Sequence, residues 1–302
     1  MKNWLKKEIK IIGAPFDMGA SLFGARLGPE ALRIEGLTQK LADLGFTVED
    51  SGNLDIKNDY KNIMENNLKN LDLTKEATEK LSSKVYETLE EDKFPLVIGG
   101  DHTLVLGSVK GLLKKYDNPG VIYFDAHADI NTEKTSLSGN IHGMPMAFLI
   151  GEGSEKMRSV GNINKNLKPE NIVYIGLRDV DPGERDYIKN LGIKAYAMED
   201  IDKLGIQKVM EESINYITKK ADQIHISFDV DSLDPKIAPG TGVKVPGGLT
   251  FREAKTALRM VSQIEKIVSV ELVEVNPLLD NQNDTAKIAV NLLETIFGKT
   301  QK

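Results

Sequence analysis

Short apolar runs alternate with longer amphipathic stretches along the chain. The apolar runs predict strands at 9–12, 46–48, 96–98, 121–124, 172–175, 193–196, 224–228 and 267–270. Apolar residues at helical spacing predict helices over 73–89 and 104–113, and the pair Thr250 and Glu253 predicts a capping box that starts another. Alternating strands and helices are typical of an α/β fold with a mainly parallel sheet. Periodicity alone fits either an open three-layer sandwich or a closed barrel.

Acidic and histidine residues follow directly on three of these predicted strands. The motifs are G-G-D-H at 99–102, D-A-H-A-D at 125–129 and D-V-D at 229–231. Side chains two residues apart on an extended chain share a face, and the carboxyl ends of parallel strands are where open α/β sheets bind ligands. We therefore expect one shared site. Its candidate residues are His102, Asp125, His127, Asp129, Asp229 and Asp231.

Four carboxylates in one place repel one another unless cations neutralise them. Two divalent ions would do so, and two imidazoles with four carboxylates supply enough ligands if two acids bridge. Oxygen-rich coordination with one nitrogen per metal favours Mn²⁺, although this ligand type also admits Zn²⁺, Fe²⁺ and Co²⁺. The alternative is that each acid is a helix cap or loop residue, the common role of aspartate after a strand. Histidine and aspartate residues follow three strands at spacings that place them on the same face, and this coincidence favours the metal site.

Composition narrows the possible classes of protein. The 302 residues are 40% apolar and contain no linker-like tract, which favours a single domain over 1–302. The absence of cysteine excludes disulfides and thiolate chemistry and fits the cytoplasm. The net charge of −6 gives no reason to expect nucleic acid, and no apolar stretch is long enough for a membrane span. We expect a soluble, unprocessed cytoplasmic protein with a small-molecule partner.

Motifs spread over nearly the whole chain resemble the arginase (ureohydrolase) family. They are G-A-R-L-G-P-E-A-L-R at 24–33, G-G-D-H at 99–102, D-A-H-A-D at 125–129, S-G-N-I-H-G-M-P at 138–145, G-L-R-D-V-D-P-G-E at 176–184, S-F-D-V-D-S-L-D-P at 227–235 and E-V-N-P at 274–277. The resemblance implies an open three-layer α/β/α sandwich around an eight-stranded, mostly parallel sheet. The chain ends soon after a predicted helix over 286–296, which looks like the bacterial type and implies a homo-hexamer.

The resemblance also implies the ligand sets of two manganese ions per subunit. One ion would have His102, Asp125, Asp129 and Asp229 as ligands, and the other would have His127, Asp125, Asp229 and Asp231. Two of these acids, Asp125 and Asp229, would be the bridges. The implied reaction is hydrolysis of L-arginine to L-ornithine and urea by a hydroxide that bridges the two manganese ions.

Two further residues have candidate catalytic roles. His142 lies in an irregular stretch over 131–145 and resembles the proton shuttle of the family, against the alternative of a merely solvated loop histidine. Glu274 would bind the guanidinium by a charge-assisted hydrogen bond. Glu271 lies near the same strand end, and the E-V-N-P motif selects Glu274. His225 shares the phase of the cluster but lies one pleat deeper, so we expect a hydrogen-bonded core or subsite histidine.

The far end of the substrate distinguishes members of this family. Neutral donors in the loop suit a carboxylate, and an acid at position 181 suits an ammonium group. The candidate substrate-binding residues are Asn131, Ser136, Ser138, Asn140 and Asp181. Ser136 stands where animal arginases tend to carry threonine. Agmatinase-like relatives lack the S-G-N-I-H-G stretch, so L-arginine is favoured over agmatine or another guanidino compound.

Lys244, within the segment 238–250, introduces a charge without an assigned role. A non-catalytic binding or regulatory protein of the same fold is the alternative from another class of function. Such a protein would usually lack a ligand or the shuttle, and here every ligand position and His142 are filled.

Overall fold

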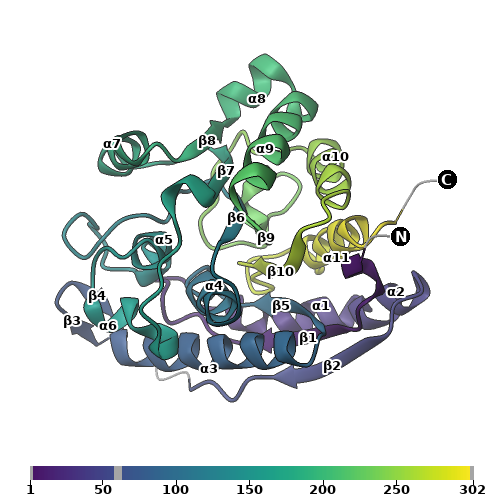
Figure 1. Cartoon of the computed structure of the whole chain (residues 1–302), viewed down its shortest axis with the longest axis horizontal. Helices are drawn as coiled ribbons and strands as arrows, with labels where there is room; N and C mark the ends of the chain where they lie inside the picture. The colour runs from purple at the N-terminus through teal and green to yellow at the C-terminus, as the bar shows by residue number, and fades with distance from the viewer. Residues whose placement is uncertain (1–2, 58–62, 300–302) are drawn as a thin grey trace.

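The computed structural model describes residues 3–57 and 63–299. Its centre is an eight-stranded sheet in which every neighbouring pair is parallel, in the order β2-β1-β5-β10-β9-β6-β7-β8. The strands are β1 (Ile9–Ala14), β2 (Val48–Asn53), β5 (Phe94–Gly99), β6 (Pro119–Phe124), β7 (Ile172–Leu177), β8 (Lys194–Ala197), β9 (Gln223–Asp229) and β10 (Ile267–Val273). This open sheet between helices confirms the predicted sandwich and excludes the barrel (Figure 1).

Helices cover both faces of the sheet. On one face α3 packs against α4, and α4 packs against α5; on the other α10 packs against α9 and α11, and α11 against α1. The helices are α1 (Gly28–Ile34), α2 (Leu37–Asp43), α3 (Leu71–Glu90), α4 (Leu104–Lys115), α5 (Pro145–Leu149), α6 (Glu155–Arg158), α7 (Pro182–Leu191), α8 (Met198–Leu204), α9 (Ile206–Lys220), α10 (Phe251–Val261) and α11 (Asp284–Ile296). A small antiparallel hairpin, β3 (Met64–Glu65) with β4 (Leu68–Lys69), lies outside the sheet.

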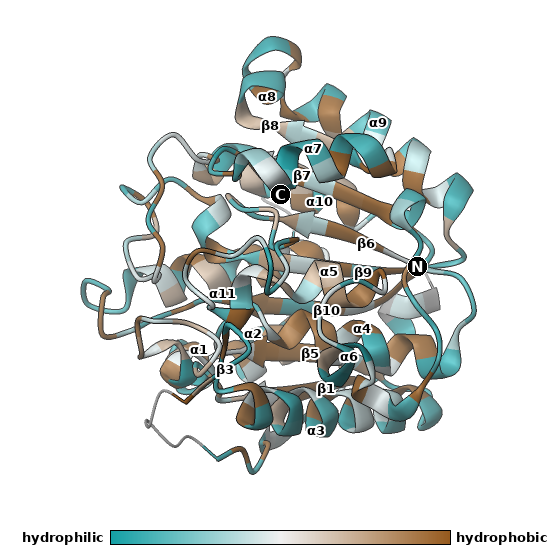
Figure 2. Cartoon of the chain, turned by 90° about the vertical axis from the view of Figure 1, so that its left-hand side faces the viewer, coloured by the Kyte–Doolittle hydropathy of each residue, from teal (hydrophilic) through white to brown (hydrophobic). Residues whose placement is uncertain are grey.

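Burial explains why these segments form strands. Every residue of β1, β5, β6 and β7 is buried, as expected for parallel strands that are covered on both faces. Strand β6 is coloured hydrophobic in Figure 2, whereas the surface helix α3 alternates between hydrophobic and hydrophilic residues. None of the described helices combines the length and apolar character needed to cross a bilayer.

The predicted elements are present, but one strand lies further along the sequence than predicted. The predicted helix after Thr250 is α10, and its capping box is formed: Glu253 N donates to Thr250 Oγ1 at 3.2 Å, and Thr250 N donates to Glu253 Oε2 at 2.8 Å. The strand predicted at 46–48 instead runs over Val48–Asn53. That segment, V-E-D-S-G-N, is a half-exposed strand at the edge of the sheet. It forms a strand because its backbone pairs with β1, and it has no apolar pattern from which it could be predicted.

Candidate active site

The candidate residues lie at the carboxyl ends of four neighbouring strands. Strands β5, β10, β9 and β6 are adjacent in the sheet, and each ends in a turn that carries one of the motifs. Two residues of these turns adopt left-handed backbone conformations, Asp129 with φ 50° and Glu274 with φ 64°. Such conformations are uncommon for residues other than glycine and are retained where the surroundings enforce them. The sheet therefore brings the motifs together, as the sequence predicts.

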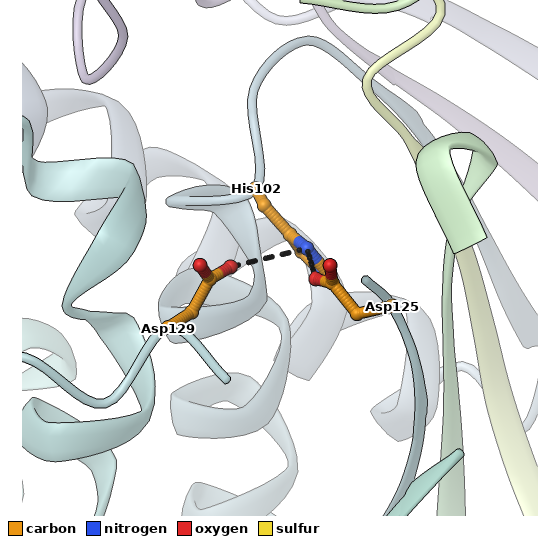
Figure 3. Close-up of side chains that lie close together, drawn as sticks. All are labelled: His102, Asp125 and Asp129. Atoms are coloured by element: carbon orange, nitrogen blue, oxygen red, sulfur yellow. Dashed lines mark ion pairs between the residues drawn. The ribbon is translucent and has the colours of Figure 1, made fainter. Parts of the chain in front are cut away.

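Histidine and aspartate side chains form two groups that share Asp125. In the first, His102 Nδ1 lies 2.8 Å from Asp125 Oδ2, 3.1 Å from Asp229 Oδ2 and 3.4 Å from Asp129 Oδ2. Figure 3 shows His102 with Asp125 and Asp129 pointing toward one another. In the second, His127 Nδ1 lies 3.1 Å from Asp231 Oδ2 and 3.2 Å from Asp125 Oδ1. Each group has the donors needed to hold a metal ion.

The acids of this cluster cannot all carry their charge unaided. Burial, followed by the charge of Asp125, raises the pKa of Asp129 to about 8 and that of Asp231 to about 6. Burial alone would lower the pKa of His102, but its contacts with Asp125 and Asp229 hold it well above the ordinary value. Positive charge is therefore required inside the cluster, from protons or from cations.

The cluster also fits divalent cations in its geometry. Asp125 Oδ2 is buried and lacks a hydrogen-bond partner among the described residues, although it lies close to His102 Nδ1. A buried carboxylate oxygen that lies this close to an imidazole nitrogen and has no other partner is suited to binding a cation together with that nitrogen. Oxygen predominates among the donors, with one imidazole in each group, which is the donor set of a hard to borderline divalent ion.

A second layer of buried polar residues supports His102. Its Nε2 lies 2.8 Å from Ser227 Oγ, and Ser227 Oγ donates to Glu271 Oε1 at 2.7 Å. Tyr123 stacks on the His102 ring at 4.4 Å and donates through its hydroxyl to Asp129 Oδ2 at 2.8 Å. The support given by Tyr123, Ser227 and Glu271 was not predicted from the sequence. Partners of this kind orient a ligating imidazole.

His225 lies below this layer and does not reach the cluster. It is fully buried, and its Nδ1 lies 2.7 Å from Ser269 Oγ. Its Nε2 lies 3.4 Å from Glu271 Oε1. This is the hydrogen-bonded core position expected from its depth along the strand.

A cavity of about 300 Å³ opens over the cluster. His142 and Glu274 both line it, and His142 Nδ1 lies 3.2 Å from Glu274 Oε1. The same oxygen accepts a hydrogen bond from His102 N at 3.0 Å, which ties the pair to the cluster. Burial lowers the pKa of His142, but the hydrogen bond and charge of Glu274 outweigh it and raise this pKa to about 9. His142 therefore carries a proton at neutral pH.

The predicted substrate-binding residues divide into two groups. Asn131, Ser138 and Asp181 line the cavity, and Asn131 Nδ2 donates to Asp181 Oδ2 at 3.0 Å. Ser136 and Asn140 are absent from the lining. Ser136 Oγ accepts from Gly139 N at 3.0 Å, so its hydroxyl serves the loop itself, while Asn140 bonds away from the cavity.

Four lining residues were not singled out from the sequence: Gly143, Asp179, Glu184 and Val243. Glu184 Oε1 accepts from Ile130 N at 3.0 Å, and its Oε2 accepts from Asp181 N at 3.0 Å. It thus joins the turn after β6 to the start of α7, and its spacing after Asp181 was the available signal. Lys244 is exposed next to Val243 and does not line the cavity.

The fold and the site define an α/β protein with paired histidine–aspartate groups suited to two divalent cations. Residues 7–298 match the model of the family described as "Arginase family". The chain is 47% identical to an arginase of Bacillus subtilis (strain 168) over 296 residues, which cover 98% of this chain and 99% of that one. The structure of an arginase from Bacillus caldovelox matches with a TM-score of 0.95 at 43% identity, over 98% of this chain and 100% of the other. The chain belongs to the arginase family.

Proposed function

We propose that this protein is a manganese-dependent enzyme that hydrolyses L-arginine to L-ornithine and urea. The observation that carries the proposal is the position of the His142–Glu274 pair in the same cavity as the two histidine–aspartate groups. The relatives named above are arginases, and they match over nearly the whole chain.

The ligand sets proposed for the two cations combine these contacts with the family resemblance. One cation would be held by His102 and by Asp125, Asp129 and Asp229, which lie around it. The other would be held by His127, Asp125 and Asp231, which are in contact, and by Asp229, which the resemblance adds as the second bridge. When bound, the cations would supply Lewis acidity that lowers the pKa of a water molecule from 15.7 to about 7. A guanidinium carbon needs such a nucleophile because its positive charge is delocalised over three nitrogens. Mn²⁺ is proposed because most of the donors are oxygens.

The chain supplies the acid and the anchor of the reaction. Glu274 lies beside the cluster and provides a carboxylate for the cationic guanidinium. His142 holds a proton at neutral pH because Glu274 raises its pKa to about 9. As the bond between the guanidinium carbon and the amine nitrogen breaks, the leaving amine needs that proton, and His142 is placed to donate it.

The far side of the cavity suits an α-amino acid. Asn131 and Ser138 offer neutral hydrogen-bond donors for the α-carboxylate, and Asp181 offers a carboxylate for the α-ammonium group. We assign Ser136 and Asn140 to the support of this loop, because they bond within it or behind it. This arrangement favours L-arginine over agmatine, which lacks the carboxylate.

We also propose a cytoplasmic homo-hexamer with a single domain over 1–302, on the resemblance to bacterial arginases. One continuous sheet, with strands from Ile9 to Val273, supports the single domain. Light scattering during size exclusion would test the assembly, with an expected mass of six chains of 33.4 kDa each.

A substrate panel tests the proposed reaction. The full-length protein would be loaded with Mn²⁺ and assayed for urea with L-arginine, agmatine and 4-guanidinobutyrate. We expect kcat/KM for L-arginine to exceed that for agmatine by about 100-fold, the loss expected when buried donors lose a charged partner. Faster turnover of agmatine would contradict the roles given to Asn131 and Ser138, which would bind the carboxylate that agmatine lacks.

A further inference from the structure

The β3–β4 hairpin braces the loop that carries the candidate substrate-binding residues. It lies at the edge of the molecule, outside the central sheet (Figure 1). Lys69 N donates to Gly139 O at 2.9 Å. Asn67 Nδ2 donates to Glu133 O at 2.8 Å and to Ser136 O at 3.0 Å. The hairpin therefore fixes the backbone on both sides of Ser138.

Lys69 also fixes the direction of one side chain in this loop. Its ammonium donates to Asn140 Oδ1 at 2.7 Å and to Ser21 Oγ at 2.8 Å, and Ser21 Oγ donates to the same Asn140 oxygen at 2.8 Å. An ammonium group only donates, so the amide oxygen must face Lys69 and the amide nitrogen must point away. Asn140 N in turn donates to Ser138 Oγ at 3.2 Å. Lys69 is thus connected through Asn140 to a residue of the cavity lining.

The cavity is lined by acidic residues, so the positive charge of Lys69 affects which substrates can bind there. The lining carries seven acidic residues and three histidines, and among the described residues no lysine or arginine lines it. The histidines and the proposed cations lie at the cluster, whereas Asp181 lies beside Asn131 at the proposed carboxylate end. A substrate carboxylate bound beside Asp181 is repelled unless positive charge is near its binding position. Lys69 supplies that charge directly behind the loop, through a partly buried contact that water screens incompletely.

We propose that Lys69 is a specificity-determining residue that selects guanidino compounds bearing a carboxylate over those that lack one. It acts by positioning Asn140 and Ser138 and by placing a positive charge behind their donors. The proposal rests on the proposed function, because it assumes that Ser138 faces the far end of the substrate.

Removal of the charge tests the proposal. In Lys69→Met, kcat/KM for L-arginine should fall by about 10-fold to 100-fold through a higher KM, the range for loss of a charged hydrogen bond, while kcat stays within twofold. The kcat/KM for agmatine should stay unchanged, because agmatine has no carboxylate to bind. Lys69→Arg should recover most of the loss. Lys69→Gln serves as a second uncharged variant if Lys69→Met does not fold.

A matched control comes from a lysine of α6 that contacts the same hairpin. Lys156 pairs with Glu65 of β3 at 4.0 Å and with Asp72, without a hydrogen bond to the loop over 131–140 among the described residues. Lys156→Met changes the net charge by the same amount, and we expect it to leave both substrates unaffected. Equal losses for L-arginine and agmatine in Lys69→Met would show a purely structural brace and overturn the proposal, as would no loss with either.

Binding of the product tests the role of Lys69 independently of the proposed reaction. Calorimetry would compare L-ornithine with 1,4-diaminobutane, which differ by the carboxylate. Lys69→Met should reduce the preference for L-ornithine by about 10-fold. A fall in this ratio supports the role of Lys69 even if the wild type makes no urea, and an unchanged ratio overturns it. Absence of urea from the wild type with any guanidino compound would count against the proposed reaction alone.

Discussion

Ser227 offers the sharpest test of the layer beneath the metal cluster. Its hydroxyl donates to Glu271 Oε1 at 2.7 Å and lies 2.8 Å from His102 Nε2. Because that hydroxyl proton is used by the carboxylate, the imidazole must donate from Nε2, so in the neutral form of His102 that can bind a cation the lone pair is on Nδ1, which faces Asp125. Ser227→Ala removes the acceptor that fixes this orientation.

The loss of stability and of metal affinity in Ser227→Ala can be estimated from the groups that lose a hydrogen-bond partner. Glu271 keeps a contact with His225 Nε2 at 3.4 Å that is not a hydrogen bond, so both Glu271 Oε1 and the buried Nε2 of His102 lose their hydrogen-bond partner. Each buried unpaired group costs about 1–3 kcal/mol of unfolding free energy. Loss of such a support reduces metal affinity by about 10-fold to 100-fold. Both effects are expected in Ser227→Ala.

Ser269→Ala is the matched control for this variant. Ser269 is equally buried, and its hydroxyl lies 2.7 Å from His225 Nδ1, which does not reach the cluster. Competition with a chelating dye would measure Mn²⁺ affinity, and urea denaturation of the metal-free protein would measure stability. Both variants should lose stability, but only Ser227→Ala should lose Mn²⁺ affinity. Wild-type affinity in Ser227→Ala, or an equal loss in Ser269→Ala, would show that Ser227 does not support His102 as a metal ligand.

Three further outcomes are expected. Asp125→Asn removes the acid shared by both groups, so mass spectrometry or atomic absorption should find neither metal tightly held; two retained ions would contradict the bridge. His142→Ala should keep both metals and slow turnover by about 10²–10⁴-fold, and an unchanged rate would exclude it as the acid. Burial, then the charge of Arg158, lowers the pKa of Lys110 from 10.5 to about 8. The charged ammonium therefore destabilises the folded state by its full amount below pH 8, and this destabilisation disappears as the pH rises to 10.5. Lys110→Met should therefore raise the unfolding free energy by about 2–3 kcal/mol at pH 7 and by much less at pH 10, and a gain independent of pH in urea denaturation would contradict this.

The metal candidates were predictable because each motif follows an apolar run directly. The apolar run marks a buried parallel strand, and the parallel arrangement places His102, Asp125 and Asp229 at one edge of the sheet. The open sandwich itself came from the resemblance, because periodicity did not exclude a barrel. Family motifs, not geometry, also separated Glu274 from Glu271.

The second layer was not predictable because it depends on strand pairing. Ser227 of β9 is the register partner of Tyr123 on β6 and of Glu271 on β10, so the three residues form a row across the sheet. A single sequence does not reveal which strands are neighbours or their register. The role of Lys69 was missed for a similar reason, since β3 and β4 have two residues each and no detectable periodicity.

We propose that six histidine and aspartate side chains hold two cations and that hydrolysis of arginine by this chain depends on both. The most direct test titrates Mn²⁺ into chelator-stripped protein and measures urea released from L-arginine at each step. We expect almost no urea at the start and a rise that saturates at two Mn²⁺ per chain. Full activity without added metal, saturation at one ion, or tight binding of two ions with no urea released would contradict the account.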